Sequence, residues 1–224
     1  MRATAIDLSS VRDLRPDALD STGRLRVLPA SFYAQTSIAD RAVFGVRTAN
    51  YLLPTDELVQ WLKLAIGGRS SLEIGSGNGV LAQAVGIRAT DNHLQARPEI
   101  ASHYRMLKQP TVDYGRNVEP LDAHAAVVKY KPEVVVAAWV THKFDESRAQ
   151  HEGNQFGVVE ERIIENCETY IFIGNTEVHK GKSIWSLEHR RIEPPWLFSR
   201  AHNGSADFIA VWGKVPDSFD KLDV

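Results

Sequence analysis

The chain has a single cysteine, little net charge and no long apolar segment. Because Cys167 is alone, it can form neither an internal disulfide nor a multi-cysteine zinc site. The formal net charge of -2 disfavours a general nucleic-acid surface, which is usually basic; only residues 179–191 are locally basic. No apolar run approaches the roughly 18 residues of a membrane-spanning helix, and the N-terminus lacks a basic-then-apolar leader. We therefore expect a cytoplasmic protein with no membrane partner.

The length of 224 residues fits one domain with a sizeable core. No internal repeat, low-complexity segment or linker divides the sequence. Prolines at Pro16 and Pro29 interrupt the first 46 residues, which we predict to form an N-terminal helical extension or lid. Residues 47–224 are predicted to form the main domain.

Residues 71–79 read Ser-Leu-Glu-Ile-Gly-Ser-Gly-Asn-Gly, and the predicted fold is centred on them. A short buried strand turns through the glycines into a helix that Gly86 ends. Such a turn lets the backbone approach a ligand closely and directs the N–H groups of a helix N-terminus at it. Glu73 adds a negative group, which favours a ligand carrying an ammonium or sulfonium over one carrying a pyrophosphate.

The glycine spacing distinguishes between two cofactors. A dinucleotide fingerprint requires Gly-x-Gly-x-x-Gly/Ala, but Val80 occupies the third small position and Gly79 comes one residue early. The pattern Glu-x-Gly-x-Gly-x-Gly instead resembles motif I of the class I S-adenosylmethionine (SAM)-dependent methyltransferases. A NAD(P)-dependent oxidoreductase on a similar fold is the alternative, which this spacing disfavours.

Strands and helices are predicted to alternate along the rest of the chain. Thr55 is a predicted N-cap for an amphipathic helix ahead of the glycines, and the apolar run at residues 134–140 is typical of a central parallel strand. The last two strand-like runs are predicted to pair as an edge hairpin. The fold class is therefore α/β: a doubly wound, mostly parallel sheet with helices on both faces and a C-terminal antiparallel hairpin. The predicted strands are residues 71–74, 87–90, 118–121, 134–140, 170–173, 183–191 and 207–212, and the predicted helices are 56–66, 80–85, 98–108, 123–130 and 158–168.

The resemblance covers about residues 47–175 and implies a set of cofactor contacts, because ligands of such sheets lie at the carboxyl ends of the strands. Asp91 would bind the ribose, whereas a plain helix-capping role explains Asp91 and Asp122 about equally well when each is taken alone. Trp139 would stack on the substrate or on adenine, although a core role explains it nearly as well. The implied SAM-binding residues are Glu73, Gly75, Ser76, Gly77 and Gly79 for the methionine part, Arg47 and Tyr51 for its carboxylate, and Asp91, Asn92, Asp122, Ala123 and Trp139.

The sequence says less about the methyl acceptor. Enzymes that methylate amino groups of nucleic acids carry Asp/Asn-Pro-Pro-Tyr/Trp after the fourth strand, where this chain has Ala-Trp-Val-Thr-His-Lys-Phe at residues 138–144. The Pro-Pro-Trp at 194–196 comes after the fifth strand, and no cysteine follows the fourth. We therefore expect O- or N-methylation of an unidentified small molecule or protein rather than of DNA bases.

His142 is the candidate general base, since a neutral imidazole can accept a proton near pH 7. A loop histidine with no catalytic role is the competing interpretation. No pair of histidines has metal-ligand spacing, so no metal is expected. A non-catalytic protein that binds SAM or S-adenosylhomocysteine (SAH) as a sensor or partner subunit stays open, because its binding residues would look the same.

Overall fold

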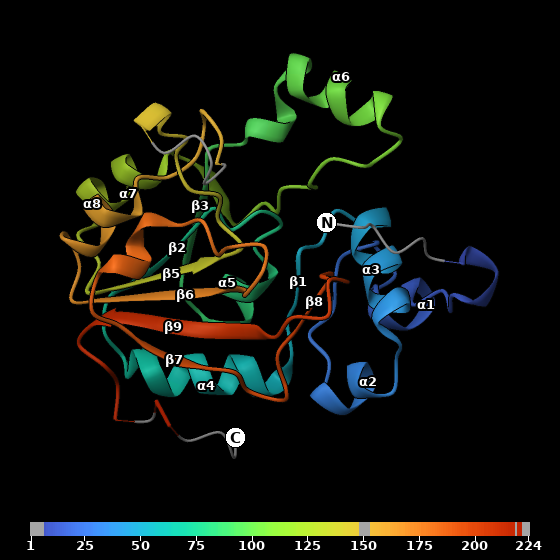
Figure 1. Cartoon of the computed structure of the whole chain (residues 1–224), viewed down its shortest axis with the longest axis horizontal. Coiled ribbons are helices and arrows are strands. Elements are labelled where there is room, and N and C mark those ends of the chain that lie inside the picture. The colour runs from blue at the N-terminus through green and yellow to red at the C-terminus, as the bar shows by residue number, and fades with distance from the viewer. Residues whose placement is uncertain (1–6, 148–152, 218, 221–224) are drawn as a thin grey trace.

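The computed structural model describes residues 7–147, 153–217 and 219–220. Within these residues, a seven-stranded sheet has the order β4-β3-β2-β5-β6-β9-β7 (Figure 1). The strands β4, β3, β2, β5 and β6 are parallel to one another, and β9 pairs antiparallel with both β6 and β7. The strands are β2 (Ser71–Ile74), β3 (Arg88–Asp91), β4 (Val118–Pro120), β5 (Val134–Ala138), β6 (Thr169–Asn175), β7 (Arg190–Ile192) and β9 (Asp207–Gly213).

Two apolar layers enclose the sheet, one on each face. Val134 and Val136 of β5 pack in the cluster that contains Trp61 of α4, whereas Val135 and Ala137 pack with α7 and α8. The continuous apolar run of β5 is therefore explained by a strand that is buried on both faces. The helices of these layers are α4 (Asp56–Ile66) and α5 (Val80–Val85) on one face and α7 (Ala123–Tyr130) and α8 (Glu160–Ile164) on the other. The predicted fold class is confirmed.

The helix α4 forms as its sequence predicts. The Thr55 side chain accepts a hydrogen bond from the N–H of Leu58, and the helix ends at Gly67 in the left-handed conformation, which glycine adopts without strain. An N-cap of this kind stabilises a helix by about 1 kcal/mol.

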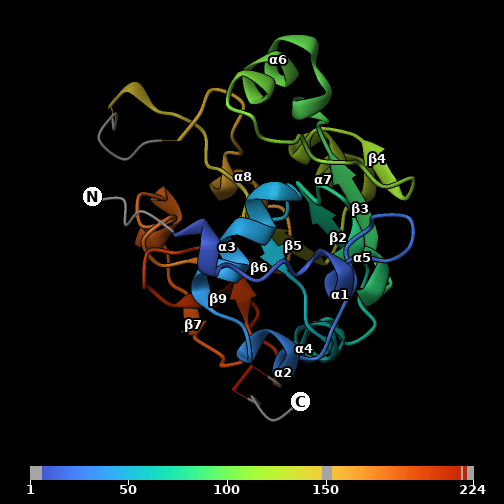
Figure 2. The ribbon, with the colours of Figure 1, turned by 90° about the vertical axis from the view of Figure 1, so that its right-hand side faces the viewer.

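The N-terminal segment packs beside the carboxyl ends of the parallel strands (Figures 1 and 2). It contains α1 (Arg15–Ala18), α2 (Ala30–Ala34) and α3 (Ile38–Arg47), which Ser37 and Asp40 begin with a capping box. Tyr33 and Phe44 share an apolar cluster with Val80 of α5. A two-stranded antiparallel sheet of β1 (Leu52–Leu53) and β8 (Phe198–Ser199) fastens this segment to the C-terminal part of the chain.

Helix α6 (Pro98–Met106) lies apart from the body of the molecule in both views (Figures 1 and 2). It has no buried residue, and Met106 is 73% exposed. It belongs to the connection between the end of β3 and the beginning of β4. Among the described residues, no helix is both long and apolar enough to cross a membrane.

Three predicted elements differ from those found. The strand β5 stops at Ala138 because Trp139 has φ 59°, a backbone conformation that does not continue a strand. The helix α8 begins only at Glu160 because the backbone of Val158 pairs with that of Thr141 and Lys143.

The third difference is at residues 183–191. The prediction of a strand there was wrong over most of its length. Ser183–Ser186 form the 3-10 helix η4, and only Arg190–Ile192 pair with β9. The indole N–H groups of Trp185 and Trp212 donate to the carbonyls of His179 and Ile184, which fixes the turn. Cations of the locally basic stretch have acidic partners: Lys180 with Glu177, Lys182 with Glu160, Arg190 with Asp220 and Arg191 with Glu193.

Candidate functional site

A cleft, here called the first cleft, opens where the strand order changes direction. From β2 the chain proceeds outward through β3 and β4, then returns to the other side of β2 with β5 and β6. In such sheets this switch point is where ligands bind. The first cleft is small, with a cavity volume of about 70 Å³, below the roughly 300–1,000 Å³ that is usual for small-molecule sites. Its lining residues are Leu25, Ala49, Asn50, Tyr51, Leu52, Pro54, Glu73, Gly75, Ser76, Gly77, Asn78, Val80, Leu81, Val112 and Ala138.

The glycine-rich turn forms the floor of the first cleft. Gly75 and Gly77 have φ values of 58° and 54°, which a residue with a side chain adopts only with strain. A Cβ atom at Gly75 would lie 2.8 Å from Cγ2 of Val140. Gly79 serves the packing of the turn instead. A Cβ there would lie 2.4 Å from Val118, so this glycine allows the turn to pack against β4.

Glu73 is a buried carboxyl group at the end of β2, with 2% of its surface exposed. Its Oε2 accepts a hydrogen bond of 2.9 Å from the N–H of Ala82 in α5. Burial, with the nearby charge of Asp91, raises the pKa of Glu73 to about 8. A positively charged neighbour would stabilise the ionised form of such a carboxyl group and lower its pKa.

The side chain of Asp91 supports the same turn from β3. Its Oδ2 accepts a hydrogen bond from the N–H of Gly77 at 3.0 Å, and its Oδ1 accepts one from the N–H of His93 at 2.9 Å. Burial raises the pKa of Asp91. The structure thus places Asp91 beside the glycine turn and gives it a structural role there, whereas its predicted contact with the ribose stays a prediction. The neighbouring Asn92 uses its side chain to accept from the N–H of Leu94.

Most N–H groups at the start of α5 already donate hydrogen bonds within the protein. Glu73 accepts from Ala82, and the side chain of Asn78 accepts from the N–H of Val80 at 3.0 Å. The expectation of open helix N–H groups directed at the ligand therefore does not describe this helix. The polar groups that line the cleft are the backbone of the glycine turn, the carboxyl group of Glu73 and the side chains of Asn50, Tyr51, Ser76 and Asn78.

Seven of the predicted cofactor residues do not line the first cleft: Gly79, Asp91, Asn92, Arg47, Asp122, Ala123 and Trp139. Arg47 is exposed in the last turn of α3, close to Asp13. Asp122 is the N-cap of α7, where it accepts from the N–H groups of His124 and Ala125. Ala123 is buried in the layer under α7. Trp139 reaches the cleft through Tyr51, with ring centroids 6.0 Å apart.

Several polar residues near the cleft have no signal in the sequence. The side chain of Asn78 donates to Asn50 at 2.6 Å, which joins the glycine turn to the segment after α3. Tyr114 stacks on His93 with ring centroids 4.0 Å apart. These partners are distant along the chain and carry no motif, so sequence spacing alone does not find them.

His142 lines a second cleft, not the first. This second cleft has a cavity volume of about 440 Å³ and lies between the loop after β5 and the start of α8. The imidazole lies close to Gly153, where an added Cβ would come within 3.0 Å of its ring. Among the described residues, no group of three or more His, Cys, Asp or Glu side chains is arranged to hold a metal ion.

The structure resembles several solved proteins, at low sequence identity. Precorrin-6y C5,15-methyltransferase from Geobacter metallireducens GS-15 matches with 13% identity and a TM-score of 0.39, over 75% of this chain and 93% of that one. The 23S rRNA methyltransferase ErmE matches with 14% identity and a TM-score of 0.36, over 74% of this chain and 70% of that one. SMU.776, crystallised with SAH, matches with 11% identity and a TM-score of 0.35, over 70% of this chain and 48% of that one. No protein-family model matches the sequence, and no curated protein does.

Proposed function

We propose that the protein is a SAM-dependent methyltransferase that binds SAM in the first cleft. The observation that carries the proposal is the pairing of a glycine-rich turn with two carboxyl groups, the buried Glu73 and the half-buried Asp91, at the switch point of the sheet. Glu73 and Asp91 both have raised pKa values because they are buried. A ligand with positive charge on an ammonium and a sulfonium complements these groups, whereas the pyrophosphate of NAD(P) would be repelled.

The residues of the cleft fit such a ligand. The turn at Gly75 and Gly77 places backbone, with no Cβ, along the floor of the cleft, and Asp91 keeps lone pairs beyond its two backbone hydrogen bonds. SAM supplies an electrophilic methyl group when it is bound. The protein's part is to align the acceptor with that methyl group and to exclude water.

The role of His142 as general base stays a prediction. Because its side chain lines the second cleft, it would reach an acceptor that extends from the first cleft past Trp139. The predicted cofactor contacts of Arg47, Asn92, Asp122 and Ala123, the division into residues 1–46 and 47–224, and a cytoplasmic location also stay predictions.

The first test is ligand preference. SAH at 100 times its Kd should raise the free energy of unfolding by about 2.7 kcal/mol, and NADP⁺ should have little effect. Asp91→Ala should weaken SAH binding by about 1.5–3 kcal/mol, the range for hydrogen bonds to a charged group. Thermal shift and calorimetry measure both. Stabilisation by NADP⁺ and not by SAH would contradict the proposal.

A second candidate is a SAM- or SAH-binding protein without catalysis. Among the described residues that line the first cleft, no histidine, lysine or cysteine is present, so apart from Glu73 the cleft itself offers few groups to take a proton. Incubation with methyl-labelled SAM and fractionated cell extract distinguishes the two. Label transferred to a molecule of the extract supports the enzyme; binding of SAH with no transfer to any fraction supports the second candidate.

A further inference from the structure

Arg200 lies against the wall of the first cleft, directly after β8. Its N–H donates to the carbonyl of Tyr51 at 3.0 Å, which extends the β1–β8 ladder by one bond. Its guanidinium carbon lies 3.6 Å from the ring centroid of Tyr51, a residue of the cleft lining. Backbone pairing and stacking together hold the cation at one place beside the cleft.

A glycine inside helix α3 makes room for the arginine. A Cβ at Gly45 would lie 2.4 Å from Cβ and 3.2 Å from Cδ of Arg200, and 2.6 Å from the carbonyl oxygen of Asn50. Glycine within a helix destabilises it relative to alanine. The aliphatic part of the Arg200 side chain passes close to α3 at this position. Packing therefore explains why a glycine is found here.

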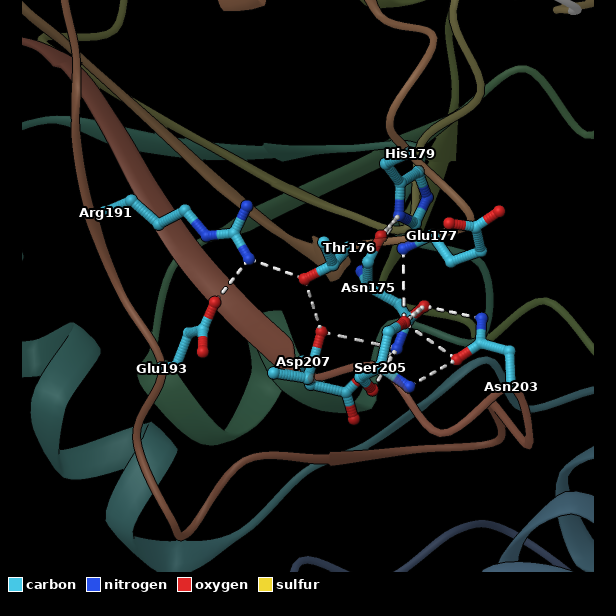
Figure 3. A network of polar contacts seen from close by, with 10 residues as sticks. Asn175, Thr176, Glu177, His179, Arg191, Glu193, Asn203, Ser205 and Asp207 are labelled. Carbon is cyan, nitrogen blue, oxygen red and sulfur yellow. Dashed lines mark hydrogen bonds and ion pairs between the residues drawn. The ribbon is translucent and has the colours of Figure 1, made fainter.

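The loop that carries Arg200 is fixed at both ends by a buried polar network (Figure 3). Asn175, fully buried at the end of β6, accepts hydrogen bonds from Asn203 and Ser205 and donates one to Asp207. The hydroxyl of Ser199 donates to Asp207 at 2.8 Å and accepts from the N–H of Ala201 at 3.1 Å. A loop held this way orders the arginine before a ligand arrives, which lowers the entropy lost on binding.

The charge of Arg200 is not matched by a carboxylate. Among the described residues, no ion pair or side-chain hydrogen bond of Arg200 is found, whereas Arg190 and Arg191 pair with Asp220 and Glu193. Guanidinium has five N–H donors in a planar fork that fits carboxylate and phosphate. Its stacking partner Tyr51 in turn contacts Trp139, with ring centroids 6.0 Å apart.

We propose that Arg200 binds an oxyanion of the methyl acceptor, a carboxylate or a phosphate attached to a flat apolar body. This inference rests on the proposed function, because it assumes that the first cleft holds the cofactor and that the acceptor enters beside it. The guanidinium takes the oxyanion, and the rings of Tyr51 and Trp139 take the apolar body. The acceptor is thus a small organic acid or phosphate ester and not a neutral molecule.

The test uses three probes that share a phenyl ring: benzoate, phenyl phosphate and benzyl alcohol. Each is titrated by calorimetry into the whole protein, alone and saturated with SAH. At least one of the two anions should bind tenfold or more tightly than benzyl alcohol, and Arg200→Gln should remove that advantage, the expected loss for a charge-assisted hydrogen bond. Arg190→Gln, which removes an arginine paired with Asp220, is the matched control and should change nothing.

Gly45→Ala is the second variant, because it keeps the guanidinium and displaces its stem. It should also weaken anion binding, while SAH affinity stays within twofold of wild type in Arg200→Gln. Equal binding of all three probes, or an unchanged anion affinity in Arg200→Gln, would overturn the proposal. So would a tenfold loss of SAH affinity in Arg200→Gln with anion binding intact, since Arg200 would then serve the cofactor. If wild type binds an anion through Arg200 but not SAH, the anion site stands and the proposed function fails.

Discussion

Glu73 serves the fold and the candidate site with one side chain. Its carboxyl group accepts the N–H of Ala82 at the start of α5 and lines the first cleft. Burying a carboxyl group favours its neutral form, and the pKa of about 8 means that a large fraction is protonated at pH 7. A cationic ligand would reverse this preference, so the protonation of Glu73 should be linked to ligand binding.

The pH dependence of stability should reveal this group. Because the pKa of Glu73 is raised from 4.5 to about 8, the folded chain holds one more proton than the unfolded chain between these values. Its contribution to the free energy of unfolding is therefore full below pH 4.5 and is lost as pH rises through 8. Glu73→Gln cannot titrate but keeps an oxygen for Ala82.

Relative to wild type, Glu73→Gln should gain stability between pH 5 and pH 9, by about 2–4 kcal/mol given roughly 1.4 kcal/mol per pKa unit. Urea unfolding at each pH measures the difference between the two proteins, which cancels the other titrating groups. A difference that does not change with pH would mean that Glu73 is ionised in the folded protein throughout this range.

At the start of α7, Asp122 could cap the helix or contact the cofactor, and two variants distinguish these roles. Asp122 is predicted as an adenine-side residue, and the structure gives it the N-cap of α7. Asp122→Ala should lower the free energy of unfolding by about 1 kcal/mol, the usual cost of losing a cap. Asp122→Asn keeps the cap and removes the charge. If SAH affinity falls in both variants, Asp122 contacts the cofactor; if it falls in neither, the carboxylate only caps the helix.

The helices and strands that could be predicted are those whose sequence pattern involves only residues close together along the chain. Thr55 and the apolar spacing after it define α4, and the continuous apolar run of β5 defines a strand buried on both faces. The prediction failed where tertiary contacts determine the local backbone conformation. Ile184 and Trp185 have an apolar pattern that also suits a strand, but hydrogen bonds from indole groups hold them in a 3-10 turn.

The candidate site was predictable to the same extent. Glycine spacing and strand ends placed Glu73, Gly75, Gly77 and Asp91 at the switch point of the sheet, because these positions depend on the fold class alone; their contacts with a cofactor stay predictions. Asn50 and Arg200 were not identified, since they reach the cleft only when β1 pairs with β8. His142 follows β5 as predicted, yet the left-handed residue Trp139 redirects the chain, and His142 lines the second cleft.

In the molecule as a whole, a buried ion pair joins four segments. Lys182 and Glu160 have side chains 0% and 1% exposed. Glu160 accepts from the hydroxyl of Tyr170 in β6 at 2.6 Å, and Lys182 donates to the carbonyl of Val140 after β5 at 2.7 Å. Burial lowers the pKa of Lys182 and raises that of Tyr170. Since Val140 also packs on Gly75, the pair supports the wall of the first cleft.

Removing one member of this pair should cost far more than removing both charges. Lys182→Met leaves the carboxylate of Glu160 buried without its cation, and the free energy of unfolding should fall by about 3–5 kcal/mol. Lys182→Met combined with Glu160→Gln removes both charges and keeps an acceptor for Tyr170, so it should recover about half of the loss or more. Urea unfolding of wild type, both single variants and the double variant gives the coupling energy. Equal losses in Lys182→Met and in the double variant would show that the carbonyl of Val140, not the charge of Glu160, is what Lys182 stabilises.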